Sequence, residues 1–246
     1  MAAGVTPAID LAAVAVERNG QRVVRDVDLT VAHGSWFGLI GANGSGKTSL
    51  LRALAGRLAF DGGSCRIDGD ELGQDRMARA LRFGFAPPAD KLPDVLRGRD
   101  VLELVGGSIE EVLFRLGSLH EALGLAPLLD QWIGNCSAGM RQRIAIAAAF
   151  AGGHALVVLD EPFNWLDPLA AFDLREALRQ RVDGGLTLVT ALHDLGTLVS
   201  ACDTGLMLAD GSVALRLDEE MLRAAGRDPK AFERQTIERL RSGAGS

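Results

Sequence analysis

A glycine-rich stretch at residues 41–48 constrains the fold of this chain more than any other feature. It reads Gly-Ala-Asn-Gly-Ser-Gly-Lys-Thr and follows the apolar run at residues 36–40, which predicts a buried strand. The leucines at positions 50, 51 and 54 then recur at helical spacing. A strand, a glycine-rich turn ending in Lys-Thr and a helix together form the P-loop arrangement. The sequence therefore predicts an α/β core that contains a phosphate-binding turn.

Each residue type in this turn has a physical role. Glycine allows positive φ, so successive N–H groups can point inward at phosphate oxygens, and the positive end of the following helix strengthens that field. Lys47 is placed to reach the β- and γ-phosphates, and the Thr48 hydroxyl to ligate Mg²⁺. An ordinary glycine-rich turn is the alternative, but it does not explain all the matched positions. The expected nucleotide-binding residues are Gly41, Asn43, Gly44, Ser45, Gly46, Lys47, Thr48 and Ser49.

Composition limits the class of protein. The chain has 246 residues, 48% hydrophobic and 24% charged, which is typical of a soluble globular protein with a sizeable core. The formal net charge of −6 argues against a dedicated nucleic-acid binder, which usually carries a basic stripe. Cys65, Cys136 and Cys202 are far apart in the sequence, which predicts reduced thiols in a cytosolic protein.

No stretch predicts a secretory signal or a membrane span. Residues 1–10 lack a basic start followed by an apolar segment. The longest apolar run, residues 144–153, is too short to cross a bilayer. We therefore expect a cytoplasmic chain that works at a membrane only through a partner.

Local signals predict the remaining elements. Asn19-Gly20 is a strong hairpin signal between two apolar segments, so an antiparallel β layer is expected ahead of the P-loop strand. Punctuated helical spacing over residues 100–130 predicts an all-helical insertion, and Ser137 is a good N-cap for an alanine-rich helix ending at residue 151. The other expected elements are strands at 83–86, 155–159, 186–190, 206–209 and 213–215, and helices at 169–182 and 219–240.

Four stretches fall in one known order. They are the P-loop, then Cys136-Ser137-Ala138-Gly139-Met140, then Asp160-Glu161-Pro162 running on to Leu166-Asp167-Pro168, then Thr190-Ala191-Leu192-His193. They resemble the Walker A motif, the signature motif, the Walker B strand with its D-loop, and the switch histidine of the ATP-binding subunit of ABC transporters. The resemblance covers residues from about Ile9 to the hairpin at Asp210-Gly211.

This resemblance implies a fold and an assembly. The fold is α/β, a P-loop NTPase core with an antiparallel β subdomain and an inserted α-helical subdomain. A single domain is expected over residues 1–246, with the helical signature subdomain at about 89–152. The assembly is a head-to-tail dimer, a homodimer or a heterodimer with a similar ATPase. It sandwiches two ATP molecules, each between the P-loop of one subunit and the signature of the other.

The resemblance also assigns residues to phosphate and metal. Ser137 and Gly139 stand at the start of a helix, where a hydroxyl, N–H groups and the helix dipole can address a γ-phosphate. Asp160 emerges from a buried strand and is expected to hold Mg²⁺ together with Thr48. Mg²⁺ and ATP are the expected cofactors.

The expected catalytic residues are Glu161, His193 and Lys47. Glu161 is placed to accept a proton from the attacking water or to orient it. His193 ends the neighbouring strand and can hydrogen-bond the γ-phosphate. Plain turn chemistry at Asp160-Glu161-Pro162 and a solvated surface histidine are the alternatives.

Two departures from the family pattern affect the nucleotide site. An aromatic residue that stacks on adenine is replaced by Asn19, and Arg18 or Arg22 could stack in its place, although solvated turn charges are the simpler interpretation of both. The Q-loop glutamine aligns with Pro88, which offers no side-chain oxygen, so Asp90 is a possible substitute. From these changes we expect slow hydrolysis.

The leading functional prediction is an ATPase subunit that powers transport through a separate transmembrane permease. The coupling surface is expected at residues 87–101 and in the helical insertion. The run Gly-Met-Arg-Gln-Arg at residues 139–143 is similar to the exporter branch of these ATPases. Two alternatives remain: a soluble ABC-type ATPase acting on nucleic acid or ribosomes, and a degenerate cassette with slow turnover. No direct contact with nucleic acid is expected.

Overall fold

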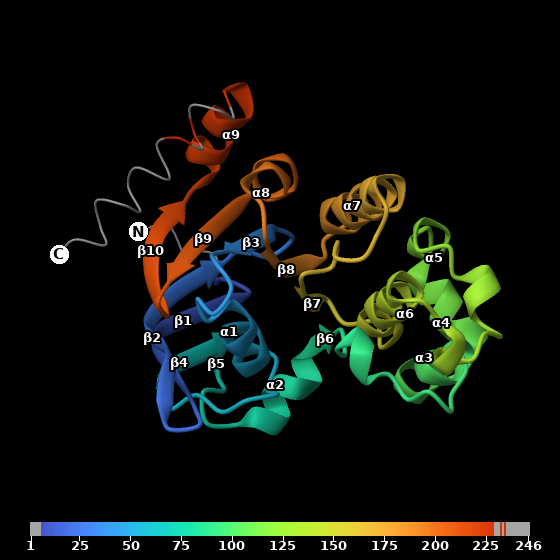
Figure 1. Cartoon of the computed structure of the whole chain (residues 1–246). Helices are drawn as coiled ribbons and strands as arrows, with labels where there is room; N and C mark the ends of the chain where they lie inside the picture. Colours follow the sequence, from blue (N-terminus) through green and yellow to red (C-terminus); the bar gives the residue numbers. More distant parts are fainter. Residues whose placement is uncertain (1–5, 229–231, 233, 235–246) are drawn as a thin grey trace.

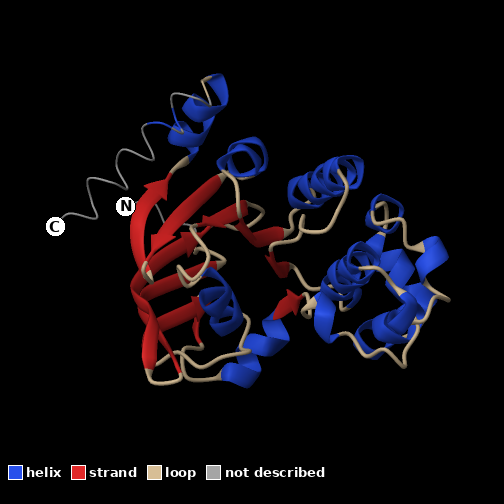
Figure 2. Cartoon of the chain, in the orientation of Figure 1, coloured by secondary structure: helices blue, strands red, loops and turns tan. Residues whose placement is uncertain are grey.

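The computed structural model describes residues 6–228, 232 and 234. Two sheets lie side by side in Figures 1 and 2, and helices α3 to α6 form a separate group at the other end of the molecule. This arrangement confirms the predicted α/β class with an antiparallel layer and a helical insertion. The single-domain extent of 1–246 and the subdomain boundaries at about 89–152 remain predictions.

The smaller sheet is antiparallel. Its strand order in the described chain is β2-β1-β4-β5. The hairpin between its first two strands turns at Asn19 and Gly20, both with positive φ, as the sequence predicted. The strands are β1 (Ile9–Arg18), β2 (Gln21–Val31), β4 (Gly62–Ile67) and β5 (Asp70–Glu71).

The larger sheet carries the site. Its order is β10-β9-β3-β8-β7-β6, with parallel pairing from β9 through β6 and an antiparallel pair between β9 and β10. All residues of β3 and β8 are buried, which explains the apolar sequence of β3 and the mostly apolar sequence of β8, where Thr187 and Thr190 are the polar residues. The strands are β3 (Trp36–Ile40), β6 (Phe83–Phe85), β7 (Leu156–Asp160), β8 (Thr187–Leu192), β9 (Thr204–Ala209) and β10 (Ser212–Leu217).

Helices α1 and α8 pack against central strands of the larger sheet, whereas α3, α4 and α5 pack against other helices. Helix α1 (Lys47–Leu54) contacts strands of both sheets, and its leucines share one apolar core with Phe37 and Leu39. Side chains cap several helix starts, including Ser137 at α6. The others are α2 (Arg76–Arg82), α3 (Gly98–Gly106), α4 (Ile109–Leu116), α5 (Leu119–Ala122), α6 (Ala138–Ala151), α7 (Pro168–Asp183), α8 (Leu195–Ala201) and α9 (Glu219–Arg227), with short 3-10 turns η1 (Ala89–Lys91), η2 (Ala126–Leu128) and η3 (Ile133–Asn135).

One sequence-based expectation is corrected at the C-terminal end. The predicted continuous helix over residues 219–240 is interrupted: α9 ends at Arg227 and Asp228 leaves the helical conformation with φ −142°, while residues 232 and 234 are again helical. Apart from residues 232 and 234, the rest of that stretch lies outside the described residues. Within the described ranges, no helix has both the length and the apolar character needed to cross a bilayer.

The parallel strands explain where the site lies. β3, β7 and β8 run in the same direction, so their carboxyl ends meet at one edge of the sheet. The glycine-rich turn follows β3, Glu161 follows β7, and His193 follows β8. Residues more than a hundred positions apart in the sequence therefore meet at a single edge.

Candidate active site

The glycine-rich turn at residues 41–46 has a backbone that requires glycine at specific positions. Gly46 precedes α1 with φ 101°, and a Cβ there would lie 2.5 Å from the carbonyl oxygen of Val23. A Cβ on Gly41 would collide with the carbonyl oxygen of Leu208. The turn therefore packs closely against both sheets, and the N–H groups at the start of α1 remain available for an anion.

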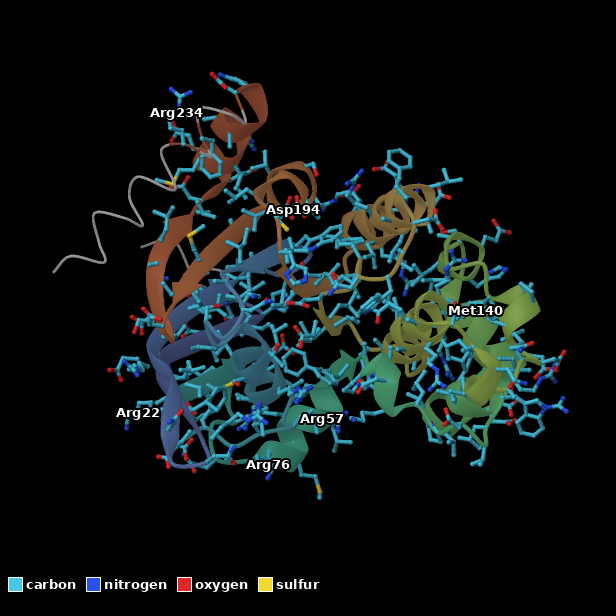
Figure 3. All side chains as sticks on the ribbon, in the orientation of Figure 1. Arg22, Arg57, Arg76, Met140, Asp194 and Arg234 are labelled. Atoms are coloured by element: carbon cyan, nitrogen blue, oxygen red, sulfur yellow. The ribbon has the colours of Figure 1, made fainter. Side chains whose placement is uncertain are left out.

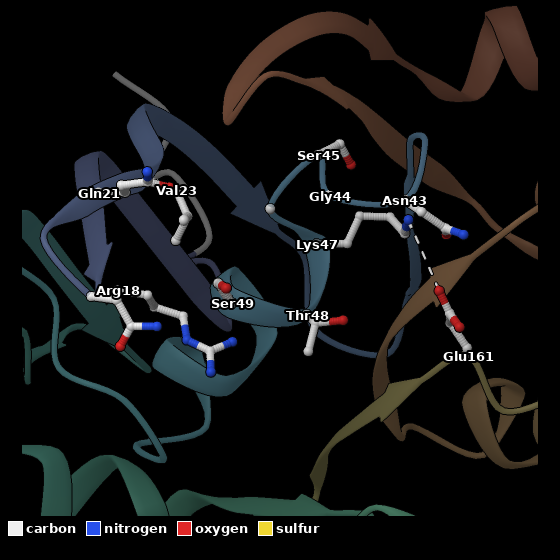
Figure 4. Close-up of a pocket in the computed structure, with 12 residues that line it drawn as sticks. Arg18, Gln21, Val23, Asn43, Gly44, Ser45, Lys47, Thr48, Ser49 and Glu161 are labelled. Atoms are coloured by element: carbon white, nitrogen blue, oxygen red, sulfur yellow. Dashed lines mark ion pairs between the residues drawn. The ribbon is translucent and has the colours of Figure 1, made fainter.

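This turn borders a cavity of about 550 Å³ (Figure 4). The Ser45 hydroxyl is buried beside it and has no hydrogen-bond partner in the described chain. A buried hydroxyl without a partner is costly, and a bound phosphate oxygen would satisfy it. The lining residues are Arg18, Asn19, Gln21, Val23, Asn43, Gly44, Ser45, Gly46, Lys47, Thr48, Ser49 and Glu161.

Lys47 is held over its own turn. Its side chain is only 4% exposed, and Nζ donates to the carbonyl oxygens of Gly41 at 2.7 Å and Ala42 at 3.3 Å. The same Nζ lies 4.0 Å from Glu161 Oε1, the ion pair drawn in Figure 4. A buried ammonium between the turn and a carboxylate places a positive charge at the cavity, where phosphate groups would bind.

Asp160 and Thr48 form an oxygen-rich pair at the end of β7. Burial raises the pKa of the Asp160 carboxyl, whereas a hydrogen bond from the Thr48 side chain acts in the opposite direction. Asp160 Oδ1 is buried and has no partner. Mg²⁺ binds hard oxygen ligands and keeps several waters, so one carboxylate and one hydroxyl fit this ion. The described residues hold no cluster of three or more histidine, cysteine or acidic ligands.

Glu161, His193 and Asn164 make a compact cluster. Glu161 Oε2 lies 2.9 Å from His193 Nε2 and accepts a hydrogen bond from Asn164 Nδ2 at 2.9 Å. The backbone of Glu161 has φ 53°, a left-handed conformation that costs free energy for a non-glycine residue. Its N–H bonds to the Ala191 carbonyl at 3.1 Å, which fixes this strained residue to β8. The position of the Glu161 carboxylate is therefore fixed by its own backbone and by its contacts with His193 and Asn164.

The signature residues lie elsewhere. Ser137 is exposed and caps α6 by accepting a hydrogen bond from Met140 N at 3.3 Å, while Gly139 is half-buried. Neither lines the cavity at the glycine-rich turn. A Cβ on Gly139 would lie 2.6 Å from the Trp165 carbonyl oxygen, so glycine allows the signature to approach closely the residue that precedes the D-loop.

The two residues that depart from the family pattern, Asn19 and Pro88, lie in different cavities. Asn19 and Arg18 both line the cavity, and Figure 4 labels Arg18 among the lining side chains, whereas Arg22 is not one of the lining residues. Pro88 and Asp90 line a second cavity of about 340 Å³, and Asp160 lines it too. Asp90 and Asp160 thus border one cavity, and the Asp90 carboxylate is exposed with its Oδ2 3.1 Å from Lys91 Nζ.

Sequence reasoning missed two residues of this region. Gln142, in the first turns of α6, donates to the carbonyl oxygens of Glu161 at 3.4 Å and Pro162 at 3.3 Å. Asn164 reaches Glu161 from the loop after β7. Gln142 stands beside the signature and Asn164 three residues after Glu161, but neither spacing by itself signals a contact.

Comparison with known proteins gives the family. The protein-family model described as "ABC transporter" matches residues 24–164 of this chain. A putative ABC transporter ATP-binding protein of Halobacterium salinarum is 36% identical over 216 residues, covering 85% of this chain and 93% of its own length. A lipopolysaccharide export system ATP-binding protein of Escherichia coli is 32% identical, with 78% and 83% covered, and an aliphatic sulfonates import ATP-binding protein of Agrobacterium fabrum is 30% identical, with 87% and 81% covered.

Comparison with solved structures gives the same family. An ATP-binding subunit of an ABC transporter superposes with a TM-score of 0.81 at 26% identity, covering 94% of this chain and 99% of its own. A dimeric bacterial ABC transporter cassette at 21% identity shares the fold, with a TM-score of 0.76 and coverage of 86% and 98%. The convergence of the P-loop, Asp160, Glu161 and His193 at one sheet edge therefore has its explanation: this chain belongs to the ABC transporter family, as an ATP-binding subunit.

Proposed function

We propose that this chain binds Mg-ATP at the cavity of the glycine-rich turn and that Glu161 drives its hydrolysis. The chain is an ABC-type ATPase subunit whose hydrolysis of ATP powers transport through a separate membrane partner. The observation that carries the residue assignment is the meeting of Lys47, Asp160, Glu161 and His193 at the carboxyl ends of β3, β7 and β8.

Each side chain has a distinct part in this proposal. Thr48 and Asp160 hold Mg²⁺, which neutralises charge on the phosphates when bound. Lys47 leaves the carbonyls of its own turn for the β- and γ-phosphates. Glu161 accepts the proton of the water that attacks the γ-phosphorus, and the bridging oxygen leaves with ADP. His193 donates to the γ-phosphate.

The proposed working unit is a head-to-tail dimer, with a homodimer as the simplest form. Support comes from the separation of Ser137 and Gly139 from the cavity of their own chain. The start of α6 is exposed and does not border the cavity of the glycine-rich turn, and a helix N-terminus is an effective anion site. The signature of a second copy can close the cavity of the first.

The proposed docking site for the permease is a groove beside β6. It encloses about 590 Å³ and is lined by apolar groups together with Arg52, Arg57, Lys91 and His154. Lys91 also pairs with Asp90, whose Oδ2 lies 3.1 Å from Lys91 Nζ and which does not line the groove. Arg57 is labelled in Figure 3 on this edge of the molecule, and its guanidinium lies 5.7 Å from the Phe85 ring centroid. An amphipathic helix carrying acidic side chains fits such a groove.

Export is the direction we propose. The support is the run at residues 139–143 that is similar to the exporter branch. Inside-out vesicles that contain the assembled transporter should take up substrate when ATP is added outside, because this chain then faces the added ATP. Uptake only by right-side-out vesicles loaded with ATP would assign import instead.

Recovery of the partner tests the proposed function. The chain, with a Glu161→Gln variant in parallel, is used to capture proteins from detergent-solubilised membranes of its native host in Mg-ATP. We expect a polytopic membrane protein in stoichiometric amount. A Lys91→Glu variant, with a reversed charge in the groove, should lose this protein while still binding ATP. The matched control is Arg227→Glu, the same kind of charge reversal at an exposed position at the end of α9. Recovery of ribosomal or nucleic-acid components alone would contradict the proposal.

A further inference from the structure

The loop after β7 contains an asparagine that touches both proposed catalytic side chains. Asn164 Nδ2 lies 2.9 Å from Glu161 Oε2 and 3.0 Å from His193 Nε2. Asn164 is half-buried and lines the 340 Å³ cavity together with Asp160 and Glu161. No other described side chain has hydrogen-bond contacts with both Glu161 and His193.

The three contacts have one consistent pattern of protons. Glu161 Oε2 is a carboxylate oxygen and can only accept, so the amide N–H of Asn164 and the Nε2–H of His193 both point at it. The 3.0 Å between Asn164 Nδ2 and His193 Nε2 is then the separation of two donors that share one acceptor. In this arrangement the Nε2–H of His193 is engaged by Glu161 and is unavailable to a phosphate.

We propose that Asn164 is a positioning residue that keeps the Glu161 carboxylate aimed at the attacking water when His193 turns to the γ-phosphate. This inference rests on the proposed roles of Glu161 and His193. When the Nε2–H of His193 moves to phosphate oxygen, Oε2 loses one of its two donors. The Asn164 amide is the remaining donor, and it leaves Oε1 free to accept the proton of the water.

The backbone supports a fixed Asn164. Glu161 and Trp165 both have positive φ, at 53° and 65°, and the Asn164 N–H bonds to the Glu161 carbonyl at 3.3 Å. Gln142 holds the carbonyls of Glu161 and Pro162 from α6. The backbone before Asn164 is thus fixed by hydrogen bonds from α6 and β8, and the left-handed residues on either side restrict the conformation of the loop. Because α6 begins at the signature, this loop also links Glu161 to the face that a second copy would touch.

The test compares two substitutions of different shape. Asn164→Asp keeps the shape but removes the donor and adds a charge beside Glu161, whereas Asn164→Ala removes both shape and donor. A donor role predicts that kcat falls about tenfold or more in Asn164→Ala, and at least as far in Asn164→Asp, with KM for ATP unchanged. A space-filling role predicts the reverse order, with Asn164→Asp the more active. Gln180→Glu, the same amide-to-acid change at an exposed site on α7, is the matched control.

Two outcomes would overturn this inference. Wild-type or increased kcat in both Asn164 variants would show that the amide does not support the reaction, and an Asn164→Asp enzyme more active than Asn164→Ala would show a packing role. Binding of a fluorescent ATP analogue and thermal unfolding establish that each variant is folded. A Glu161→Gln variant separates the two proposals: if it retains full hydrolysis, the assignment of Glu161 itself is wrong.

Discussion

At the scale of single residues, the site contains buried polar atoms without hydrogen-bond partners and a residue with a strained backbone. Asp160 Oδ1 and Ser45 Oγ are buried without partners, and Glu161 holds a left-handed backbone. Such features cost stability and persist where function needs them. Asp160 was identified from the sequence because it ends a buried strand, but its missing partner could be recognised only in three dimensions.

The raised pKa of Asp160 makes a prediction for stability. Because burial favours the protonated form in the fold, the unfolded chain holds this proton less tightly, and the ionised carboxylate destabilises the fold at neutral pH. Asp160→Asn should raise Tm without nucleotide by about 2–4 °C at pH 8, or about 1 kcal/mol. The gain should shrink as pH falls through the raised pKa, where wild-type Asp160 becomes neutral.

Thermal unfolding at pH 8 and pH 5, with and without Mg-ATP, checks this. The same variant should lose hydrolysis, since the amide does not bind Mg²⁺ as a carboxylate does. An equal Tm difference at both pH values would mean that the charge of Asp160 is not the cause.

At the scale of elements, the sequence predicted the elements that depend on local signals, but not those that depend on packing against distant residues. The P-loop, the hairpin at Asn19-Gly20 and the Ser137 cap depend on neighbouring residues, so the sequence contained them. Helix α2 was not predicted, because it is fixed by Arg79, a fully buried guanidinium that donates to carbonyls of four other residues, Ala53, Leu58, Leu72 and Gly73. Helix α8 was also missed.

Two serine caps allow the signature helix to be tested. Ser137 caps α6 and Ser108 caps α4, each accepting a backbone N–H at 3.3 Å. Either change to alanine should cost about 1 kcal/mol of stability. Only Ser137→Ala should also reduce hydrolysis, by tenfold or more, because only that hydroxyl is proposed to meet a γ-phosphate. Steady-state ATPase rates beside chemical denaturation check the pair, and an equal loss of rate in both variants would contradict the proposed role.

At the scale of the whole molecule, the site is in two parts. The larger sheet brings together Lys47, Glu161 and His193, while Ser137 stands exposed on the helical group seen apart from the sheets in Figure 1. The sequence could give both halves, and their supply by two different subunits, only through the family resemblance. The residues alone could not show that the two halves are separated within one chain, because that follows from how α6 packs against the rest.

Mixing two inactive variants is the most direct test of this two-part site. Lys47→Ala removes the P-loop lysine and Ser137→Ala the signature hydroxyl, so each homodimer has two damaged sites. After subunit exchange, each mixed dimer has one intact site, made by the P-loop of the Ser137→Ala chain and the signature of the Lys47→Ala chain. With half of the dimers mixed, ATP hydrolysis should recover to as much as about a quarter of the wild-type rate. If mixed dimers form and hydrolysis stays at the level of the separate variants, the site is not shared between two copies.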